Sequence, residues 1–192
     1  MDLIWAQVWA PPLASKEDAI DWVSGAIASE RLEARPALDV AASHIAEPGS
    51  HRYRLVRDGD VVDAWGMVEI MASWVDRYGV CSIEDGLGED DWEGWVELTR
   101  RLGSVIQLVG DDLFATNLNR VQQGIAAGAA NAVLVKPNQA GTLTETLAVI
   151  AAAKAAGLAT IVSARSGETE DSFVADLAVG SAAGQLKVGS VT

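Results

Sequence analysis

Residues 80–87 read Val80-Cys81-Ser82-Ile83-Glu84-Asp85-Gly86-Leu87, a short apolar run that ends in two carboxylates and a glycine. Residues 106–113 repeat the arrangement as Ile106-Gln107-Leu108-Val109-Gly110-Asp111-Asp112-Leu113. This pattern is typical of a buried parallel strand that delivers an acidic side chain to the rim of a sheet. A single pair of such runs is explained equally well by the alternative that acidic residues commonly end strands without forming a site.

Repetition along the chain favours the first interpretation. An upstream apolar run ends at Asp39, and three later runs end at Lys136, Arg165 and Lys187. The carboxyl ends of the strands in a parallel barrel all lie on one rim. Three acidic and three basic side chains are therefore expected to meet there and form a site.

Apolar strands alternate with helices through most of the sequence, which predicts right-handed βα units and a parallel sheet. The expected strands are 37–41, 80–84, 105–110, 132–136, 158–163 and 184–188. The expected helices are about 15–31, 68–79, 90–102, 117–127, 141–156 and 169–179. Between the first two helices, residues 53–56 predict a small hairpin strand around Asp58-Gly59.

A single domain spanning residues 1–192 accommodates all of these elements. The six rim strands are fewer than the eight of a closed (β/α) barrel, so two parallel edges are expected to stay open. Either the sheet is open, or another chain supplies the missing strands. The predicted fold class is α/β, a partial TIM-type barrel with its helices outside.

Composition limits the classes of function. The formal net charge of −13 argues against binding to nucleic acids or anionic membranes, because no basic patch is present to neutralise phosphates. No apolar run is long enough to span a bilayer, and the first residues do not resemble a secretion signal. We therefore expect a cytoplasmic protein. Its single cysteine, Cys81, is expected to be buried and inert.

Asp39, Glu84 and Asp111 form a set of hard oxygen ligands at three strand ends. Three converging carboxylates repel one another unless a cation lies between them, and such oxygen ligands suit Mg²⁺. Histidine is absent from every predicted strand end, which argues against zinc or a redox metal. The alternative is that the three carboxylates are solvated and bind no metal.

The basic residues of the rim also have two interpretations each. Lys136 follows a strand that is apolar on both faces, so it is either a general base held away from water or a structural partner of Asp111 or Glu84. Arg165 and Ser166 lie where a strand turns into a helix, which is typical of a phosphate site or of an ordinary helix cap. Lys187 is placed to hold a second anionic group.

Several long motifs resemble enolase over roughly residues 9–192. The motifs are Ala37–Ser43, Ser82–Leu87, Glu89–Trp95, Gly110–Leu113, Lys136–Thr146 and Ser163–Asp171. The resemblance implies the C-terminal barrel portion of an enolase, without the N-terminal capping domain and the first barrel strands. Motifs of this length are far more specific than any short pattern.

The resemblance also implies roles. Asp39, Glu84 and Asp111 would hold a Mg²⁺ ion that clamps the carboxylate of a small phosphorylated acid. Lys136 would take the proton alpha to that carboxylate. The remaining three residues would bind substrate, with Arg165 and Ser166 on the phosphate and Lys187 on the carboxylate end.

The sequence departs from the enolase pattern at two places. Enolases read Ser-His-Arg-Ser-Gly-Glu-Thr-Glu-Asp where this chain has Ala164 in place of the histidine. The segment before Trp9-Ala10-Pro11 lacks the acidic-glycine run that carries the general acid in enolases. The half of the site that binds metal and removes the proton is therefore expected to be present, and the dehydrating half to be absent.

These features leave three functions open. The first is an enolase-type lyase that acts on 2-phosphoglycerate and phosphoenolpyruvate as one subunit of a split enzyme, with a second chain that completes a hetero-oligomer. The second is an enolase-like carboxyphosphonoenolpyruvate synthase of phosphonate biosynthesis, which would not eliminate water. The third is a binding remnant that keeps the fold without turnover.

Overall fold

The chain is described from a computed structural model that covers residues 16–55, 60–165 and 171–188. Its elements in the first half are α1 (Lys16–Ser29), β1 (Ala37–Asp39), η1 (Ala42–His44), β2 (Arg52–Arg54), β3 (Val61–Asp63), α2 (Ala64–Tyr78), β4 (Ser82–Glu84) and α3 (Trp92–Leu102). Those in the second half are β5 (Gln107–Gly110), α4 (Leu118–Ala127), β6 (Ala132–Val135), α5 (Pro137–Ala140), α6 (Leu143–Ala155), β7 (Ala159–Ser163), α7 (Phe173–Gly180) and β8 (Gly184–Lys187).

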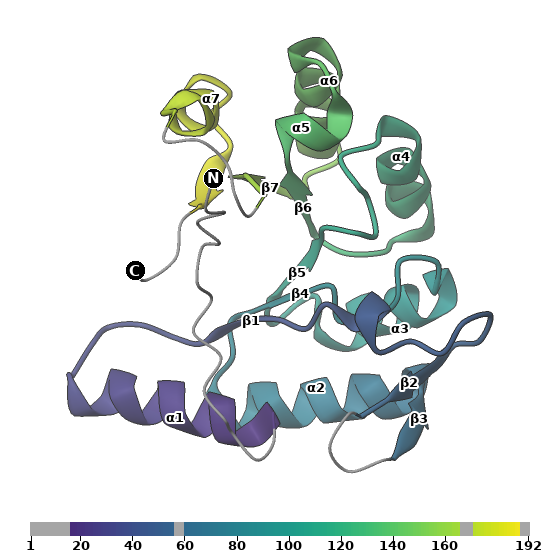
Figure 1. The fold of residues 1–192 in the computed structure, drawn as a ribbon, viewed down its shortest axis with the longest axis vertical. Helices are drawn as coiled ribbons and strands as arrows, with labels where there is room; N and C mark the ends of the chain where they lie inside the picture. Colours follow the sequence, from purple (N-terminus) through teal and green to yellow (C-terminus); the bar gives the residue numbers. More distant parts are fainter. Residues whose placement is uncertain (1–15, 56–59, 166–170, 189–192) are drawn as a thin grey trace, which may run out of the picture.

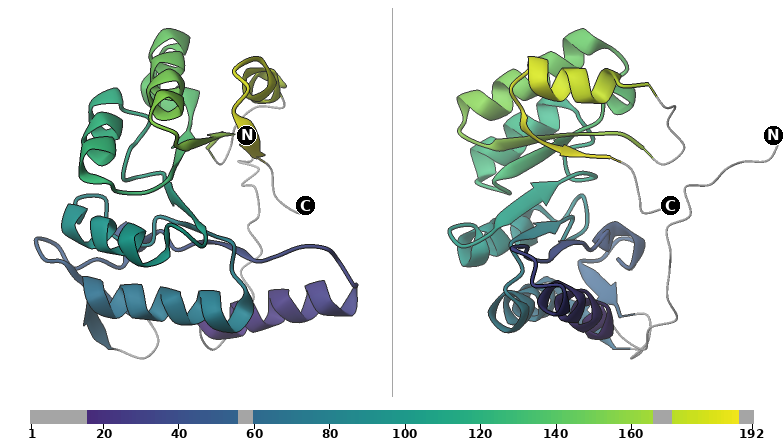
Figure 2. Two further views of the ribbon diagram at one scale, coloured as in Figure 1. Left: turned by 180° about the vertical axis from the view of Figure 1, so that it is seen from behind. Right: turned by 90° about the vertical axis from the view of Figure 1, so that its left-hand side faces the viewer.

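Six strands form one parallel sheet in the order β1-β4-β5-β6-β7-β8, which follows the order of the chain. The sheet curls, with helices along its outer side and an open side between its first and last strands (Figure 1, Figure 2). This arrangement confirms the predicted fold class, a partial TIM-type barrel. It also places the carboxyl ends of all six strands on one rim.

The central strands divide their residues between two apolar clusters because successive side chains of a strand point to opposite faces. Val133 and Val135 of β6 belong to the large core beneath the helices. Ala132 and Leu134 face the other way and pack with Val109 and Ile161 in a much smaller cluster inside the curled sheet. The helix-covered side of the sheet therefore holds most of the buried apolar surface.

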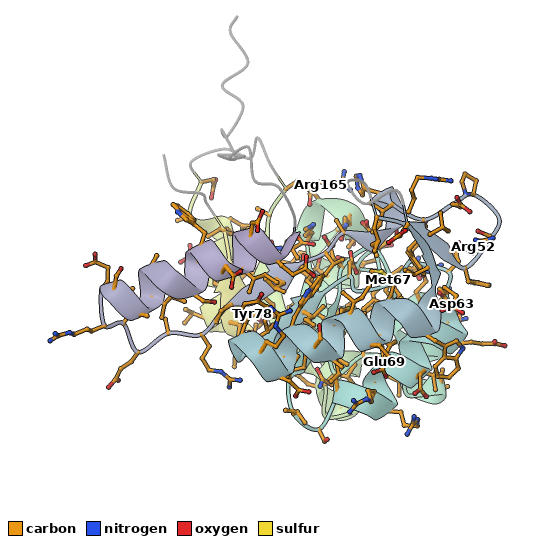
Figure 3. All side chains as sticks on the ribbon, turned by 90° about the horizontal axis from the view of Figure 1, so that it is seen from below. Arg52, Asp63, Met67, Glu69, Tyr78 and Arg165 are labelled. Carbon is orange, nitrogen blue, oxygen red and sulfur yellow. The ribbon has the colours of Figure 1, made fainter. Side chains whose placement is uncertain are left out.

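Side-chain caps begin several of the helices that cover the sheet. Asp63 accepts a hydrogen bond from the backbone N–H of Gly66 at the start of α2, and Thr142 accepts one from Glu145 at the start of α6. The buried face of α2 includes Met67, whereas Glu69 lies on its exposed face (Figure 3). Gly79 ends α2 in the left-handed conformation, with φ of 66°, that glycine adopts without strain.

The structure differs from the sequence predictions in local detail. β2 covers residues 52–54, so the predicted hairpin strand at 53–56 is misplaced by one to two residues, and the predicted turn at Asp58-Gly59 lies outside the described residues. Cys81 is partly exposed, which corrects the expectation that it is buried. It directly precedes β4, and its Sγ atom lies 3.4 Å from the carbonyl oxygen of Pro36. Among the described residues, we find no helix with the length and apolar character that crossing a bilayer requires.

Candidate metal and acid-base site

Register places the predicted site residues side by side at the rim. Asp39 and Glu84 are direct neighbours on the parallel strands β1 and β4. Asp111 and Lys136 follow the last residues of β5 and β6, and Lys187 is the last residue of β8. Five of the seven residues predicted from the sequence therefore lie at the carboxyl ends of strands of one sheet, on β1, β4, β5, β6 and β8.

Lys187 joins the two edges of the sheet. Its Nζ atom lies 2.6 Å from Oε1 of Glu84 and 3.0 Å from Oδ2 of Asp39. Because Asp39 ends the first strand of the sheet and Lys187 ends the last, these contacts bring the two edges together at the rim. The ammonium group of Lys187 lies between two of the three carboxylates that the sequence assigns to a metal.

Lys136 and Asp111 form the second charged pair of the rim. The Lys136 ammonium donates to Oδ2 of Asp111, and the Gln139 side-chain amide donates to Oδ1 over 3.4 Å. Both charged side chains are largely shielded from water, at 13% and 11% exposure. This pairing is what a structural ion pair would show. It also places a lysine beside the carboxylate cluster, as a general base would require. The role of Lys136 as a base therefore stays a prediction.

Glu84 is a strongly perturbed carboxylate of the rim. Burial raises its pKa from the ordinary 4.5 to about 7, and the neighbouring charges of Asp39 and Asp111 act in the same direction. The hydrogen bond from Lys187 lowers the pKa but does not offset the burial. Carboxylates that meet where little water reaches them favour either uptake of a proton or a neighbouring positive charge. The raised pKa of Glu84 and its contact with the Lys187 ammonium show both tendencies.

Sequence reasoning missed Asp85 as a functional residue. Its carboxylate is buried and accepts the backbone N–H groups of Asp111 and Asp112 over 2.9 and 2.8 Å. Burial raises the pKa of Asp85 to about 7. The signal in the sequence was the acidic pair Glu84-Asp85. Adjacent side chains at a strand end point in different directions. Glu84 therefore faces the rim, while Asp85 holds the loop that carries Asp111.

A family model described as enolase, C-terminal TIM barrel domain, matches residues 7–192. The chain belongs to the enolase family. This match confirms the resemblance of its motifs to the C-terminal barrel portion of an enolase, and it covers every strand of the curled sheet. An enolase-family barrel domain is characteristic of an enzyme. It leads us to expect metal-dependent chemistry at the rim.

The residues of this enolase-family rim suit a hard metal ion. Asp85, Asp111 and Asp112 each present an oxygen within 4.8 Å of the others, so this trio could hold a cation. It shares Asp111 with the predicted set of Asp39, Glu84 and Asp111. Both oxygens of Asp85 accept backbone N–H groups, and both oxygens of Asp111 contact side-chain donors. Among the described residues only the trio of Asp85, Asp111 and Asp112 meets this distance, so the predicted set of Asp39, Glu84 and Asp111 stays a prediction. Every donor in either set is a carboxylate oxygen, which suits Mg²⁺, although the identity of the metal stays a prediction.

The predicted phosphate site is only partly described. Arg165 follows the end of β7 by two residues, and its side chain is exposed (Figure 3). Across the described ranges, no ion pair joins Arg165 to the carboxylates of the rim. Ser166 lies outside the described residues, so its predicted role on the phosphate stays a prediction.

Proposed function

We propose that this enolase-family chain carries out Mg²⁺-dependent chemistry of the phosphopyruvate hydratase type on a small phosphorylated carboxylic acid. The observation that carries the proposal is the shielded lysine Lys136 beside a converging set of carboxylates at the rim of an enolase barrel domain. A general base and an oxygen-rich cation site in contact with each other are what removal of a proton alpha to a carboxylate requires. The proposed location, the cytoplasm, rests on the sequence alone.

Each rim residue takes one task in the proposed reaction. Lys136 in its neutral form accepts the alpha proton at Nζ. Asp39, Glu84 and Asp111 hold the metal, which when bound supplies positive charge that stabilises the negative charge developing on the substrate carboxylate. Lys187 would hold the carboxylate end of the substrate. The phosphate binds at Arg165 and Ser166.

A second chain is part of the proposal. Among the described residues, β1 pairs only with β4, and β8 pairs only with β7, so one parallel edge of each is open. Leu186 of β8 is 44% exposed on such an edge, and exposed edge strands favour pairing with further strands. We propose that a partner carrying the enolase N-terminal part and the first barrel strands covers both edges. Native mass spectrometry of the chain purified from its source should find the hetero-oligomer, and a purely monomeric chain would contradict it.

A non-dehydrating reaction is the second candidate. Ala164 stands beside Arg165 where the enolase pattern has a histidine, and a methyl group can neither donate nor accept a proton. A carboxyphosphonoenolpyruvate synthase would keep the metal and Lys136. Its enolate or enol oxygen would form a bond to the phosphorus of a phosphonoformyl donor as the bond from that phosphorus to the donor's leaving group breaks. In that reaction no hydroxide leaves, so a general acid is not needed.

One experiment separates these functions. The assembled complex is incubated with 2-phosphoglycerate and Mg²⁺ in D₂O, and both deuterium at the alpha carbon and phosphoenolpyruvate are measured. Formation of phosphoenolpyruvate supports dehydration, whereas exchange without phosphoenolpyruvate supports the non-dehydrating reaction. Mg²⁺-dependent binding with neither signal identifies a binding remnant and contradicts the proposed activity.

A further inference from the structure

The hydroxyl of Thr116 lies directly behind the charged pair of Lys136 and Asp111. Its Oγ1 atom accepts the backbone N–H of Lys136 over 2.9 Å and donates to Oε1 of Gln139 over 2.7 Å. Thr116 is 2% exposed, so water does not compete for this hydroxyl. One buried side chain therefore fixes both the start of the segment that follows β6 and the side chain of Gln139.

The amide of Gln139 has only one orientation that satisfies these contacts. Because its Oε1 atom accepts from Thr116, its Nε2 atom faces Asp111 and donates to Oδ1 over 3.4 Å. Lys136 donates to the other oxygen, Oδ2. The two oxygens of Asp111 are thus held by two different donors, and both donors are positioned through Thr116.

The backbone that presents Thr116 is strained. Ala115 and Thr116 have φ of 45° and 49°, in the left-handed region that a β-branched residue rarely adopts. Such conformations persist where surrounding contacts hold them, and they concentrate at functional sites. Here the N–H of Ala115 donates to the carbonyl of Asp111 over 2.7 Å, which ties the strained turn to the residue that it supports.

We propose that Thr116 and Gln139 are positioning residues that couple the orientation of Lys136 to that of Asp111. The inference rests on the proposed function, in which Lys136 is the base and Asp111 a metal ligand. Donors behind a ligating carboxylate orient it and leave the intended lone pair for the metal. Loss of the Thr116 hydroxyl frees the Gln139 amide to rotate and leaves the N–H of Lys136 without its partner, so both members of the pair lose their alignment.

The test compares Thr116→Val, which keeps the shape and removes the hydroxyl, with Thr116→Ser, which keeps the hydroxyl. Thr116→Val should raise the Mg²⁺ dissociation constant and lower the kcat of alpha-proton exchange, each about tenfold to a hundredfold, with KM nearly unchanged. Thr116→Ser should restore both, and the exposed Thr144→Val on α6 should alter neither. Gln139→Met, which removes both side-chain hydrogen bonds, provides a second variant if Thr116→Val does not fold.

Two further readouts separate this inference from the proposed function. Mg²⁺ affinity by calorimetry and hydrogen exchange of the Lys136 backbone amide need no turnover. The amide should lose protection in Thr116→Val and keep it in Thr116→Ser. If the wild-type complex exchanges no alpha proton, the proposed function fails, and these two readouts still decide the positioning role. The inference is overturned if Thr116→Val keeps the wild-type Mg²⁺ affinity, or if Thr116→Val and Thr116→Ser lose equal amounts of affinity. A wild-type chain that binds no Mg²⁺ overturns both the inference and the proposed function.

Discussion

The centre of the sheet and its two edges carry the same kind of ion pair in different surroundings. Lys136 and Asp111, at the central strands β5 and β6, are 13% and 11% exposed, whereas Lys187 and Asp39, at the edge strands β8 and β1, are 46% and 47% exposed. Charges shielded from water interact far more strongly than charges within it. The comparison indicates that the central pair interacts more strongly than the edge pair, whose contact also brings the two open sides of the sheet together at the rim.

The largest expected effect is the loss of the central lysine. Lys136→Ala should reduce alpha-proton exchange by a factor of about 10²–10⁴, which is the usual contribution of a general base. Mg²⁺ affinity should stay nearly unchanged, because the carboxylates remain. Deuterium incorporation from D₂O measures the first quantity and calorimetry the second. Lys154→Ala, on the exposed side of α6, is the matched control, and exchange at the wild-type rate in Lys136→Ala would make that lysine a structural partner only.

A core substitution compares the packing of the same two regions. Leu134 of β6 is fully buried, so Leu134→Ala should lower the free energy of unfolding by about 2–5 kcal/mol. Leu186 of β8 is half-exposed, and Leu186→Ala should cost roughly 0.5 kcal/mol or less, as surface substitutions do. Urea denaturation measures both. Similar losses at the two positions would show that the edge is packed as tightly as the centre.

The pH dependence of stability reports on Glu84, which lies between the two regions. Its pKa is raised from 4.5 to about 7, so between these values the folded chain holds a proton that the unfolded chain has released. The free energy of unfolding should therefore fall as the pH rises through this window, by on the order of 1–3 kcal/mol. In thermal melts from pH 4.5 to 8, this loss of stability should be smaller in Glu84→Gln than in the wild type. The loss that remains in the variant should come from Asp85. A slope that Glu84→Gln leaves unchanged would contradict the assignment.

The smallest effect is expected from the edge pair itself. Asp39→Asn removes the exposed partner of Lys187 and should change the free energy of unfolding by no more than about 1 kcal/mol, the usual range for surface ion pairs. Urea denaturation at low and high salt measures the change. A loss of several kcal/mol would mean that the edge is shielded from water, as it would be beneath the proposed partner chain.

Local sequence patterns determined the fold class and the residues at the strand ends. The apolar runs ending at Glu84, Asp111 and Lys136 are local signals, because a buried strand shows its length and its last residue within a few positions. The regular alternation of these runs with helices was enough to predict one parallel sheet with a shared rim. The motif of residues 136–146 is local too, and it carries part of the resemblance to the enolases.

Only the tertiary structure decided which groups meet. The contact of Lys187 with Asp39 spans 148 positions and depends on how far the sheet curls, and no local pattern encodes that curl. Thr116 reaches Lys136 only because two residues before α4 adopt left-handed backbone conformations, which the sequence Ala115-Thr116 does not favour. The anchoring role of Asp85 likewise depends on the approach of the loop after β5. Hydrogen bonds and ion pairs of this kind arise from register and curvature, which are properties of the assembled sheet.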